Sequence, residues 1–325
     1  MGRPVVILDN LSRGGVDRNA VWLQRKHGRK VRVVVGDVRN REDIGQALNG
    51  AEQVFHFAAQ AAVTTSIADP RTDFEINALG TLNLLEAIRE MESPPPLVYT
   101  STNKVYGRLD DVRLHAAGKR YEPVDAQTAE HGVPESRPLE FHTPYGCSKG
   151  AAEQYVLDYA RSFGQPGAVF RMSCIYGPRQ FGTEDQGWVA HFLIRALEGK
   201  PITLYGDGLQ VRDLLFVDDL VNAFLLAQER MPRISGEAFN IGGGPPRTTS
   251  LLELLDTISW LHGRTPRLFF ESSRTGDQRY YVSDTAKFRA ATGWEPHIAL
   301  RDGVRRLYEW LIESRSVAME ELAAS

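Results

Sequence analysis

The sequence predicts an α/β protein with a doubly wound parallel sheet and a smaller C-terminal α/β lobe. Short apolar runs alternate along the chain with amphipathic segments, which is typical of βαβ units. The runs are also continuously apolar, as expected for strands buried on both faces by helices. Finally, 325 residues with 42% hydrophobic content are enough to bury a sizeable core.

The alternation is clearest in the first half of the chain. Buried strands are expected at 5–8, 31–35, 54–58, 97–100 and 168–171, and helices at 77–91 and 149–163. After about Gly177 the pattern loosens into possible strands at 202–204, 214–217, 239–241 and 267–270 and helices at 189–197, 219–228 and 250–261. We therefore expect a sheet domain at 1–176 and a ligand-covering lobe at 177–325, some of whose segments return to the main sheet.

Composition restricts the partners. A formal net charge of −3 gives no reason to expect nucleic acid or an acidic membrane, so an anionic ligand would need a few placed arginines. The two cysteines, Cys147 and Cys174, have neither metal-ligand spacing nor disulfide density, so free thiols and no metal are expected. No signal-peptide pattern or run of roughly 18 apolar residues occurs, which predicts a soluble cytoplasmic protein.

The sequence does not contain the usual opening of a dinucleotide-binding sheet. That opening is a strand, a G-x-G-x-x-G turn and a helix whose N-terminus receives a pyrophosphate. Here the first apolar run ends in Leu8-Asp9-Asn10, which suits the second strand, where a carboxylate takes ribose hydroxyls. The chain is therefore expected to begin about one βα unit into the fold.

Tyr145 and Lys149 are four residues apart at the expected start of a helix, so both project from one face. A tyrosine has an ordinary pKa of about 10, and a neighbouring ammonium and an oxidised nicotinamide both favour its phenolate. The pair therefore suits a general base, with the lysine also binding nicotinamide-ribose hydroxyls. By itself the Y-x-x-x-K spacing is weak, because any helix can show it by chance.

Other strand ends strengthen this hypothesis. Clustered hydroxyls follow the expected strand at 97–100, where open parallel sheets place ligands, and Thr102 there is a candidate to bond a substrate oxygen. Alone, Thr102 would be interpreted as a solvated turn residue. The strand at 54–58 ends in small residues that allow close approach of a cofactor, and Asn77 opens the next helix.

Taken together, the motifs resemble the extended short-chain dehydrogenase/reductase family, and within it the NAD-dependent nucleotide-sugar epimerases and dehydratases. The resemblance runs from about Val5 to Trp310 and includes the phrases at 171–178, 205–213 and 274–278. It implies a Rossmann-like fold with NAD as cofactor. The implied catalytic residues are Thr102, Tyr145 and Lys149.

The resemblance also implies two sets of binding residues. The cofactor set, which includes Tyr145 and Lys149, comprises Asp9, Asn10, Asp37, Val38, Phe57, Ala58, Ala59, Asn77 and Thr100. The substrate set comprises Thr65, Ser66, Thr102, Asn103, Gln186, Gly187, Val189, Tyr205, Arg212, Arg274 and Asp277. Arg212 and Arg274, with Asp277, match positions that grip the diphosphate and the nucleoside ribose. Asp9 favours NAD over NADP, although Arg13 nearby can accept a 2′-phosphate.

The residues after the active hydroxyl distinguish the reactions. Family dehydratases and decarboxylases usually carry an acidic residue there, whereas this chain has Asn103 and Lys104. Loss of water is therefore disfavoured, leaving epimerisation by transient oxidation. The strings at 101–107, 143–152 and 179–188 are similar to those of the family's 2-epimerases of the type that converts CDP-paratose to CDP-tyvelose. The resemblance implies a CDP-linked sugar as substrate and leaves open whether it is a CDP-deoxyhexose such as CDP-paratose or a fully hydroxylated CDP-hexose.

Two alternatives stay open. A UDP-sugar 4-epimerase would use the same Tyr, Lys and hydroxyl group while presenting C4 to the nicotinamide. A non-catalytic nucleotide-binding relative is the second, because the glycine-rich turn is not in the sequence. For assembly, the family commonly pairs subunits through the helices at 73–91 and 145–163, which implies a homodimer or homotetramer.

Overall fold

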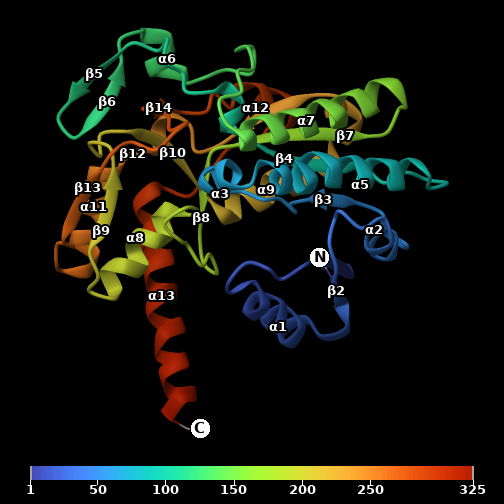
Figure 1. The fold of residues 1–325 in the computed structure, drawn as a ribbon, viewed down its shortest axis with the longest axis horizontal. Helices are drawn as coiled ribbons and strands as arrows, with labels where there is room; N and C mark the ends of the chain where they lie inside the picture. The colour runs from blue at the N-terminus through green and yellow to red at the C-terminus, as the bar shows by residue number, and fades with distance from the viewer. Residues whose placement is uncertain (1, 324–325) are drawn as a thin grey trace. The chain divides into compact units, whose positions relative to one another are not determined.

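The computed structural model describes residues 2–323, which form an α/β fold in two compact units (Figure 1). Unit 1 comprises Met1–Ser101, Pro144–Phe170 and Ala227–Ala238, and unit 2 comprises Thr102–Thr143, Arg171–Leu226 and Phe239–Ser325. The segment Thr102–Thr143, which was expected in the N-terminal domain, therefore belongs to unit 2. Ala227–Ala238, which was expected in the C-terminal lobe, belongs to unit 1.

Unit 1 contains five parallel-sheet strands and the helices between them. The strands lying wholly or mainly in it are β1 (Val5–Asp9), β2 (Val31–Val35), β3 (Val54–His56), β4 (Leu97–Thr102) and β7 (Gly167–Met172). Its helices are α1 (Val16–His27), α2 (Arg41–Leu48), α3 (Val63–Ala68), α4 (Pro70–Phe74), α5 (Gly80–Arg89), α7 (Pro144–Ser162) and α10 (Met231–Ile234), with a 3-10 turn at Gly28–Lys30. All five strands predicted for this half of the chain are present.

The sheet of unit 1 has two parts. β3, β4 and β7 are neighbours in that order, and β3 pairs parallel with β4. β1 and β2 form a parallel pair of their own, with Val5 opposite Val31 and Asp9 opposite Val35. The core lies between β4, α5 and α7, where Leu85, Ile88, Leu97 and Val156 are almost fully buried.

The helix predicted at 77–91 is the end of a longer helical segment. α4 runs into a π-helical turn at Glu75–Leu79 and then into α5, so the helical stretch starts at Pro70. Asp69 caps it by accepting a hydrogen bond from the backbone N–H of Thr72 at 3.1 Å. The π turn contains Asn77, and such turns are frequent at functional sites.

Unit 2 is arranged around β10 (Val211–Phe216), which pairs parallel with β8 (Cys174–Tyr176) and β14 (Tyr280–Tyr281) and antiparallel with β12 (Thr248–Ser250). Two further pairs accompany it: β9 (Ile202–Tyr205) with β13 (Leu268–Glu271), and the hairpin of β5 (Leu114–Ala117) and β6 (Arg120–Pro123). The remaining elements are β11 (Ala238–Ile241), α6 (Ala126–His131), α8 (Trp188–Leu197), α9 (Val217–Glu229), α11 (Leu251–His262), α12 (Ala286–Thr292) and α13 (Leu300–Ala323), with 3-10 turns at Asn103–Tyr106 and Pro245–Arg247.

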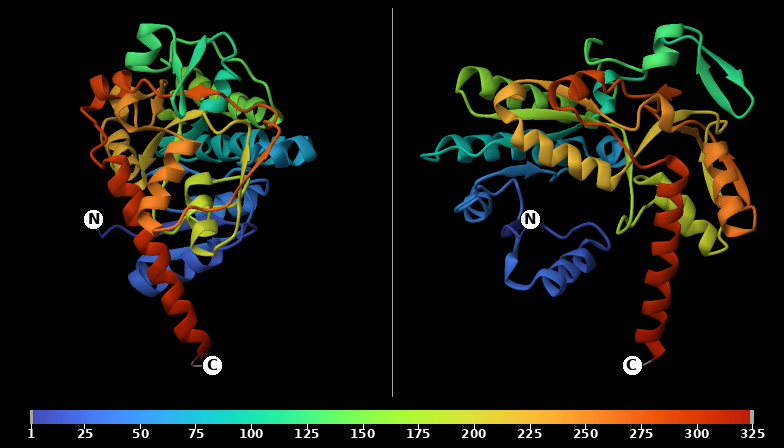
Figure 2. Two further views of the ribbon diagram at one scale, coloured as in Figure 1. Left: turned by 90° about the vertical axis from the view of Figure 1, so that its left-hand side faces the viewer. Right: turned by 180° about the vertical axis from the view of Figure 1, so that it is seen from behind.

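The core of unit 2 is formed by α8, α11 and the first turns of α13 packing together (Figure 2). α13 approaches the sheet closely at Gly303, where an added Cβ would overlap the hydroxyl of Tyr176 and come within 2.9 Å of Phe216. Those two aromatic rings pack edge to face, with centroids 5.5 Å apart. In the described part of the chain no helix is both long and apolar enough to cross a membrane.

This close approach predicts a stability difference between two helical glycines. Gly303→Ala should destabilise the protein by about 1–3 kcal/mol, because the methyl group overpacks two aromatic rings. Gly45→Ala in α2 is the matched control, since nothing lies within 4 Å of its added Cβ. It should stabilise by about 0.5–1 kcal/mol through helix propensity. Urea unfolding measures both, and equal stability of the two variants would contradict the packing of α13.

Candidate active site

α7 carries the two residues of the Y-x-x-x-K motif in its first turns, in unit 1. The backbone N–H of Tyr145 donates to the hydroxyl of Ser66 at 3.2 Å, which fixes the start of α7 against α3. The Tyr145 side chain is half-buried, whereas Lys149 is 2% exposed. The same helix thus carries a partly accessible phenol and, one turn later, a buried lysine.

The ammonium of Lys149 lies 4.2 Å from the centroid of the Tyr99 ring on β4. Burial lowers the pKa of Lys149 to about 7, and the carboxylates of Glu153 and Asp73 oppose that shift. His56 at the end of β3 is also buried, and burial together with the Lys149 charge lowers its pKa to about 3. His56 is therefore neutral at physiological pH, and its Nε2 lies 3.0 Å from the Thr81 hydroxyl.

A buried polar cluster locks α7 against the helical segment that contains the π turn. The Ser148 hydroxyl donates to Asp73 Oδ2 at 2.5 Å and accepts from Asn77 Nδ2 at 3.0 Å. Asn77 Nδ2 also donates to Asp73 Oδ1 at 3.1 Å, and Asn77 Oδ1 accepts from the backbone N–H of Gln60 at 2.9 Å. Asn77, predicted as a cofactor contact, is 1% exposed and holds the loop after β3 in place.

The other predicted cofactor residues of unit 1 lie at strand ends. Asp9 ends β1 and its Oδ1 accepts from the backbone N–H of Leu11 at 2.8 Å. Asn10 Nδ2 donates to Asp37 Oδ2 at 3.2 Å. Hydrogen bonds from Arg39 are the main cause that lowers the pKa of Asp37 to about 2. Asp9, Asn10 and Asp37 thus place two carboxylates and an amide beside the β1–β2 pair.

Residues predicted around the loop after β3 have mixed surroundings. Thr100 donates from its hydroxyl to the His56 carbonyl at 2.9 Å and so ties β4 to β3. Val38 packs against Gly80 of α5, where an added Cβ would come within 2.7 Å. Phe57 is exposed, and the partly buried Ala58 and Ala59 follow it in the loop. The strand expected at 54–58 therefore ends two residues early.

Two residues predicted for the substrate lie on α3. Ser66 is fully buried, and its hydroxyl donates to the Val63 carbonyl at 2.7 Å while accepting from Tyr145 N–H. The carbonyl of Thr65 accepts from Asp69 N–H at 2.9 Å, which ends α3. Ser66 is thus a positioning contact for α7.

In unit 2, the first candidate is Thr102, the last residue of β4. Its hydroxyl accepts from the backbone N–H of Lys104 at 3.2 Å, capping the 3-10 turn Asn103–Tyr106, and donates to Asn103 Oδ1 at 3.3 Å. Thr102 and Asn103 are each 7% exposed. Thr102 therefore lies at a turn but is not solvated, and its hydroxyl is held on two sides.

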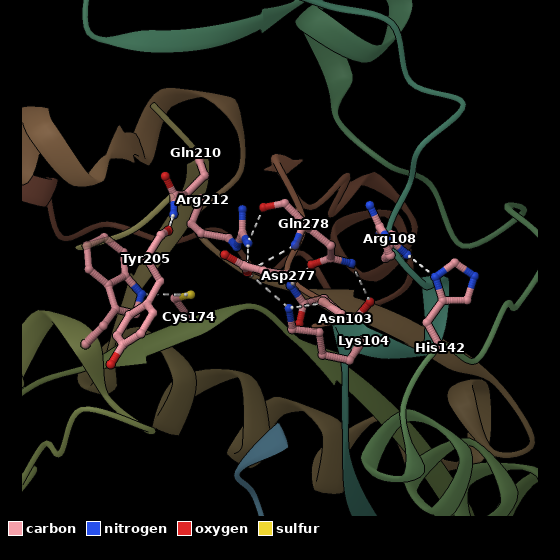
Figure 3. A network of polar contacts seen from close by, with 12 residues as sticks. Asn103, Lys104, Arg108, His142, Cys174, Tyr205, Gln210, Arg212, Asp277 and Gln278 are labelled. Atoms are coloured by element: carbon pink, nitrogen blue, oxygen red, sulfur yellow. Dashed lines mark hydrogen bonds and ion pairs between the residues drawn. The ribbon is translucent and has the colours of Figure 1, made fainter. Parts of the chain in front are cut away.

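Asp277 holds two cations in the same unit (Figure 3). Arg212 on β10 donates from Nη2 to Asp277 Oδ1 at 2.8 Å, and Lys104 Nζ lies 3.5 Å from the same oxygen and 3.1 Å from the Gly276 carbonyl. Burial raises the pKa of Asp277, but the charges of Arg212 and Lys104 outweigh it and hold the pKa below its ordinary value. Asp277 is therefore ionised, whereas burial lowers the pKa of the Lys104 ammonium beside it.

A second charged group lies around Tyr205 at the end of β9, where Arg274 forms ion pairs with Glu184 and Asp185 at 3.4 Å each. The guanidinium of Arg274 stacks 3.7 Å from the centroid of the Tyr205 ring, and its Nη1 donates to the Glu184 carbonyl at 3.0 Å. The Tyr205 hydroxyl donates to the Glu184 carboxylate. The predicted residues Arg274 and Tyr205 are therefore brought together, with an acidic loop between β8 and α8 as their neighbour.

The remaining predicted substrate residues lie at the start of α8. Gln186 N–H donates to the Thr183 carbonyl at 3.3 Å, and Gly187 caps α8 with a φ of 78°, a left-handed conformation that favours glycine. Val189 is 2% exposed and belongs to the core of unit 2. Its side chain thus packs the helix whose N-terminus carries Gln186 and Gly187.

Several residues of these clusters were not found from the sequence. Glu153 lies one helical turn after Lys149, so helical spacing was an available signal. Its carboxylate accepts from the Ser101 hydroxyl at 2.6 Å. Asp73 likewise lies one helical turn before its partner Asn77. Gln278 gave no such signal, because its side-chain partners Asn103 and Gly107 lie 175 and 171 residues away in the chain. No group of three or more His, Cys, Asp or Glu side chains suited to a metal ion occurs among the residues that the structure describes.

Comparisons with known proteins identify the family of the chain. Residues 4–242 match the model of the NAD dependent epimerase/dehydratase family. A CDP-paratose 2-epimerase of Salmonella typhi is 43% identical over 316 residues, covering 95% of this chain and 92% of that protein. A UDP-glucose 4-epimerase of Thermotoga maritima, solved with UDP-glucose, superposes with a TM-score of 0.80 at 30% identity, covering 96% of this chain and 91% of that one.

A third relative links the fold to the cofactor. The UDP-glucose 4-epimerase of Thermus thermophilus, solved in complex with NAD, has a TM-score of 0.77 at 32% identity and covers 94% of this chain and 90% of that one. The chain therefore belongs to the NAD dependent epimerase/dehydratase family. It is accordingly an enzyme of the nucleotide-sugar epimerase and dehydratase class, as the sequence motifs predicted.

The buried Lys149 predicts a pH dependence of stability. The pKa of a lysine in the unfolded chain is about 10.4, and burial lowers that of Lys149 to about 7 in the native state. Between these two pH values the native state binds fewer protons than the unfolded state, so the free energy of unfolding rises with pH. From pH 7 to pH 9 the wild type should gain about 2 kcal/mol of unfolding free energy relative to Lys149→Met. Urea unfolding at both pH values measures the difference.

The exposed Lys119 provides the control, because its ion pair with Asp256 lies at the surface. Lys119→Met should keep the full pH-dependent gain of the wild type. A Lys149→Met variant that gained as much stability as the wild type would show that burial does not shift this lysine.

Proposed function

We propose that this enzyme is an NAD-dependent 2-epimerase of CDP-linked sugars, of the type that converts CDP-paratose to CDP-tyvelose. The observation that carries the proposal is the turn after Thr102, where an amide and an ammonium follow the hydroxyl in place of a carboxylic acid. The carboxylate nearest that ammonium belongs to Asp277, and two cations keep it ionised. Elimination of water from the sugar would need an acid, and this turn does not provide one. Transient oxidation of a sugar carbon and return of its hydride do not need such an acid.

The proposed chemistry is a proton transfer coupled to transient oxidation at C2. The Tyr145 phenolate takes the proton of the C2 hydroxyl, and the same group returns it after the sugar has turned over. Thr102 bonds the C2 oxygen in both orientations, and the ammonium of Lys149 favours the phenolate form of Tyr145. When bound, NAD would supply the reversible hydride acceptor for C2, and Lys149 would hold its nicotinamide ribose.

The donor set of unit 1 fits NAD. Asp9 uses one carboxylate oxygen for the Leu11 N–H, and the other suits an adenosine ribose hydroxyl. A carboxylate at this place repels the 2′-phosphate of NADP, which outweighs the opposite preference of Arg13. Lys149 is proposed to hold the nicotinamide ribose, since its ammonium rests on an aromatic ring and keeps its N–H donors for hydroxyls. Asp37 with Val38 is proposed to border the adenine.

The nucleotide end of the substrate is assigned to the cations of unit 2. Arg212 and Arg274 present planar forks that suit a diphosphate, and Asp277 is proposed to orient Arg212. Gln186, Gly187 and Tyr205 are proposed to border the nucleoside, beside the start of α8. A CDP-hexose or CDP-deoxyhexose is the expected partner, on the basis of the similarity to the Salmonella typhi enzyme.

A 4-epimerase of UDP-sugars is the second candidate. It is favoured by the 30% identity to the Thermotoga maritima UDP-glucose 4-epimerase, and it would use Tyr145, Lys149 and Thr102 in the same roles at C4. The position of the inverted carbon separates the two. A non-catalytic nucleotide-binding protein is the third candidate, and absence of turnover with every sugar would favour it.

A homodimer or homotetramer is proposed for the assembly. Phe74 on α4, Leu79 before α5 and Phe163 after α7 are exposed large apolar side chains on the helices named for subunit pairing. Their burial against a second copy would remove apolar surface from water.

The first test locates the inverted carbon. Incubation with CDP-paratose, CDP-glucose and UDP-glucose, followed by NMR of the products, should show inversion at C2 of a CDP-sugar. Tyr145→Phe should lower kcat by about 10²- to 10⁴-fold, because the general base is lost, while nucleotide-sugar affinity stays within a few-fold. Tyr308→Phe on α13 is the control, since its hydroxyl contacts only His262 among the described residues. Inversion at C4 alone, or an active Tyr145→Phe, would overturn the proposal.

The second test concerns the diphosphate. Arg212→Gln should weaken CDP binding at least about tenfold, because a charge-assisted fork to the diphosphate is removed. Arg305→Gln on α13 is the matched control, since this arginine makes exposed ion pairs to Asp302 and Glu309. Calorimetric titration with CDP measures both. Equal affinity of the two variants would remove Arg212 from the nucleotide site.

A further inference from the structure

A chain of hydrogen bonds leads away from Thr102 to Gln278, the last residue of the phrase at 274–278, to which the sequence assigned no role. Asn103 accepts the Thr102 hydroxyl with Oδ1 and donates from Nδ2 to Gln278 Oε1 at 3.2 Å. Gln278 is 1% exposed and lies 175 residues further along the chain than Asn103. Figure 3 shows the two amides facing each other within the network around Asp277.

The surroundings of Gln278 fix which way its amide points. Its Nε2 donates to the Gly107 carbonyl at 2.7 Å and to the Asn103 carbonyl at 3.3 Å. Both carbonyls can only accept, so the nitrogen must face them and the oxygen must face Asn103. Asn103 is then obliged to offer Nδ2 to Gln278 and Oδ1 to Thr102. The orientation of two side-chain amides is thus determined by Gln278.

The backbone of Gln278 is anchored to the cation cluster. Its carbonyl accepts from Arg212 Nη2 at 2.5 Å, and its N–H donates to Asp277 Oδ1 at 3.0 Å. The same Arg212 nitrogen binds Asp277 Oδ1. Gln278 therefore connects the arginine assigned to the diphosphate with the hydroxyl assigned to the sugar.

We propose that Gln278 is a positioning residue for the epimerisation, acting through Asn103 on the hydroxyl of Thr102. Before the reaction, the Thr102 hydroxyl donates its hydrogen to Asn103 Oδ1. A lone pair of the Thr102 oxygen is then available to accept a hydrogen bond from the C2 hydroxyl of the substrate. The Thr102 hydroxyl turns its hydrogen from Asn103 to the C2 oxygen when that oxygen becomes a carbonyl. This role rests on the proposed function, because it needs a sugar oxygen that loses and regains its proton.

The test is a split between kcat and KM. Gln278→Met keeps the length of the side chain and removes its amide, so Asn103 is free to rotate and Thr102 loses its fixed acceptor. The expected result is a fall in kcat of about tenfold with KM for the nucleotide sugar within about twofold, as for an interaction used in the transition state. Gln165→Met is the matched control, because the buried side-chain amide of Gln165 has no hydrogen-bond partner among the described residues. It should keep kcat.

A double-mutant cycle shows whether Gln278 acts through Asn103. Asn103→Ala should lower kcat as much as Gln278→Met, and the double variant should be no slower than either single variant. Asn103→Ala with wild-type kcat, additive losses, or a rise in KM alone would overturn the positioning role. If Gln278→Met does not fold, Asn103→Ala carries the kcat test by itself.

The comparison is made on whichever nucleotide sugar the wild type inverts, so the two proposals fail separately. Inversion at C4 contradicts the 2-epimerase assignment and leaves the Gln278 test intact. A wild type that turns over, with a Gln278→Met variant equally fast, contradicts only the positioning role.

Discussion

One carboxylate, that of Asp277, organises the cation cluster of unit 2. Asp277 binds both Arg212 and Lys104, so two side chains that repel each other when both are charged are held close. Because Arg212 is 8% exposed at its side chain, removal of Asp277 would leave a largely buried charge unpaired. The neighbouring Gln278 links Arg212 and Asp277 to the turn after Thr102 through hydrogen bonds.

Unit 1 also holds a buried basic side chain. Lys149 is buried beside an aromatic ring, and burial lowers its pKa to about 7, while Glu153 and Asp73 supply negative charge that partly offsets the cost. An ammonium poised in this way responds to small changes of charge nearby, which suits a residue that assists a tyrosine base. The cluster of Asp73, Ser148 and Asn77 gives α7 the rigidity that such tuning requires.

Local pattern was sufficient for the strands of unit 1 and for the Y-x-x-x-K helix, because buried parallel strands are continuously apolar and the motif lies within one helical turn. It failed where tertiary contacts decide. The β5–β6 hairpin and α1 have few buried side chains, and no helix was predicted where α13 lies. The contact of Asn103 with Gln278 joins residues 175 positions apart through hydrogen bonds alone, so no spacing rule indicates it.

The central claim is that the sugar is oxidised and restored at C2 without losing water or leaving the protein. The most direct measurement is the fate of a deuterium placed at C2 of CDP-paratose. We expect the epimerised product to keep the deuterium at C2. When unlabelled CDP-paratose is epimerised in deuterated water, we expect the product to take up no deuterium at C2. Loss of the label to solvent, or inversion of a sugar carbon other than C2, would contradict it.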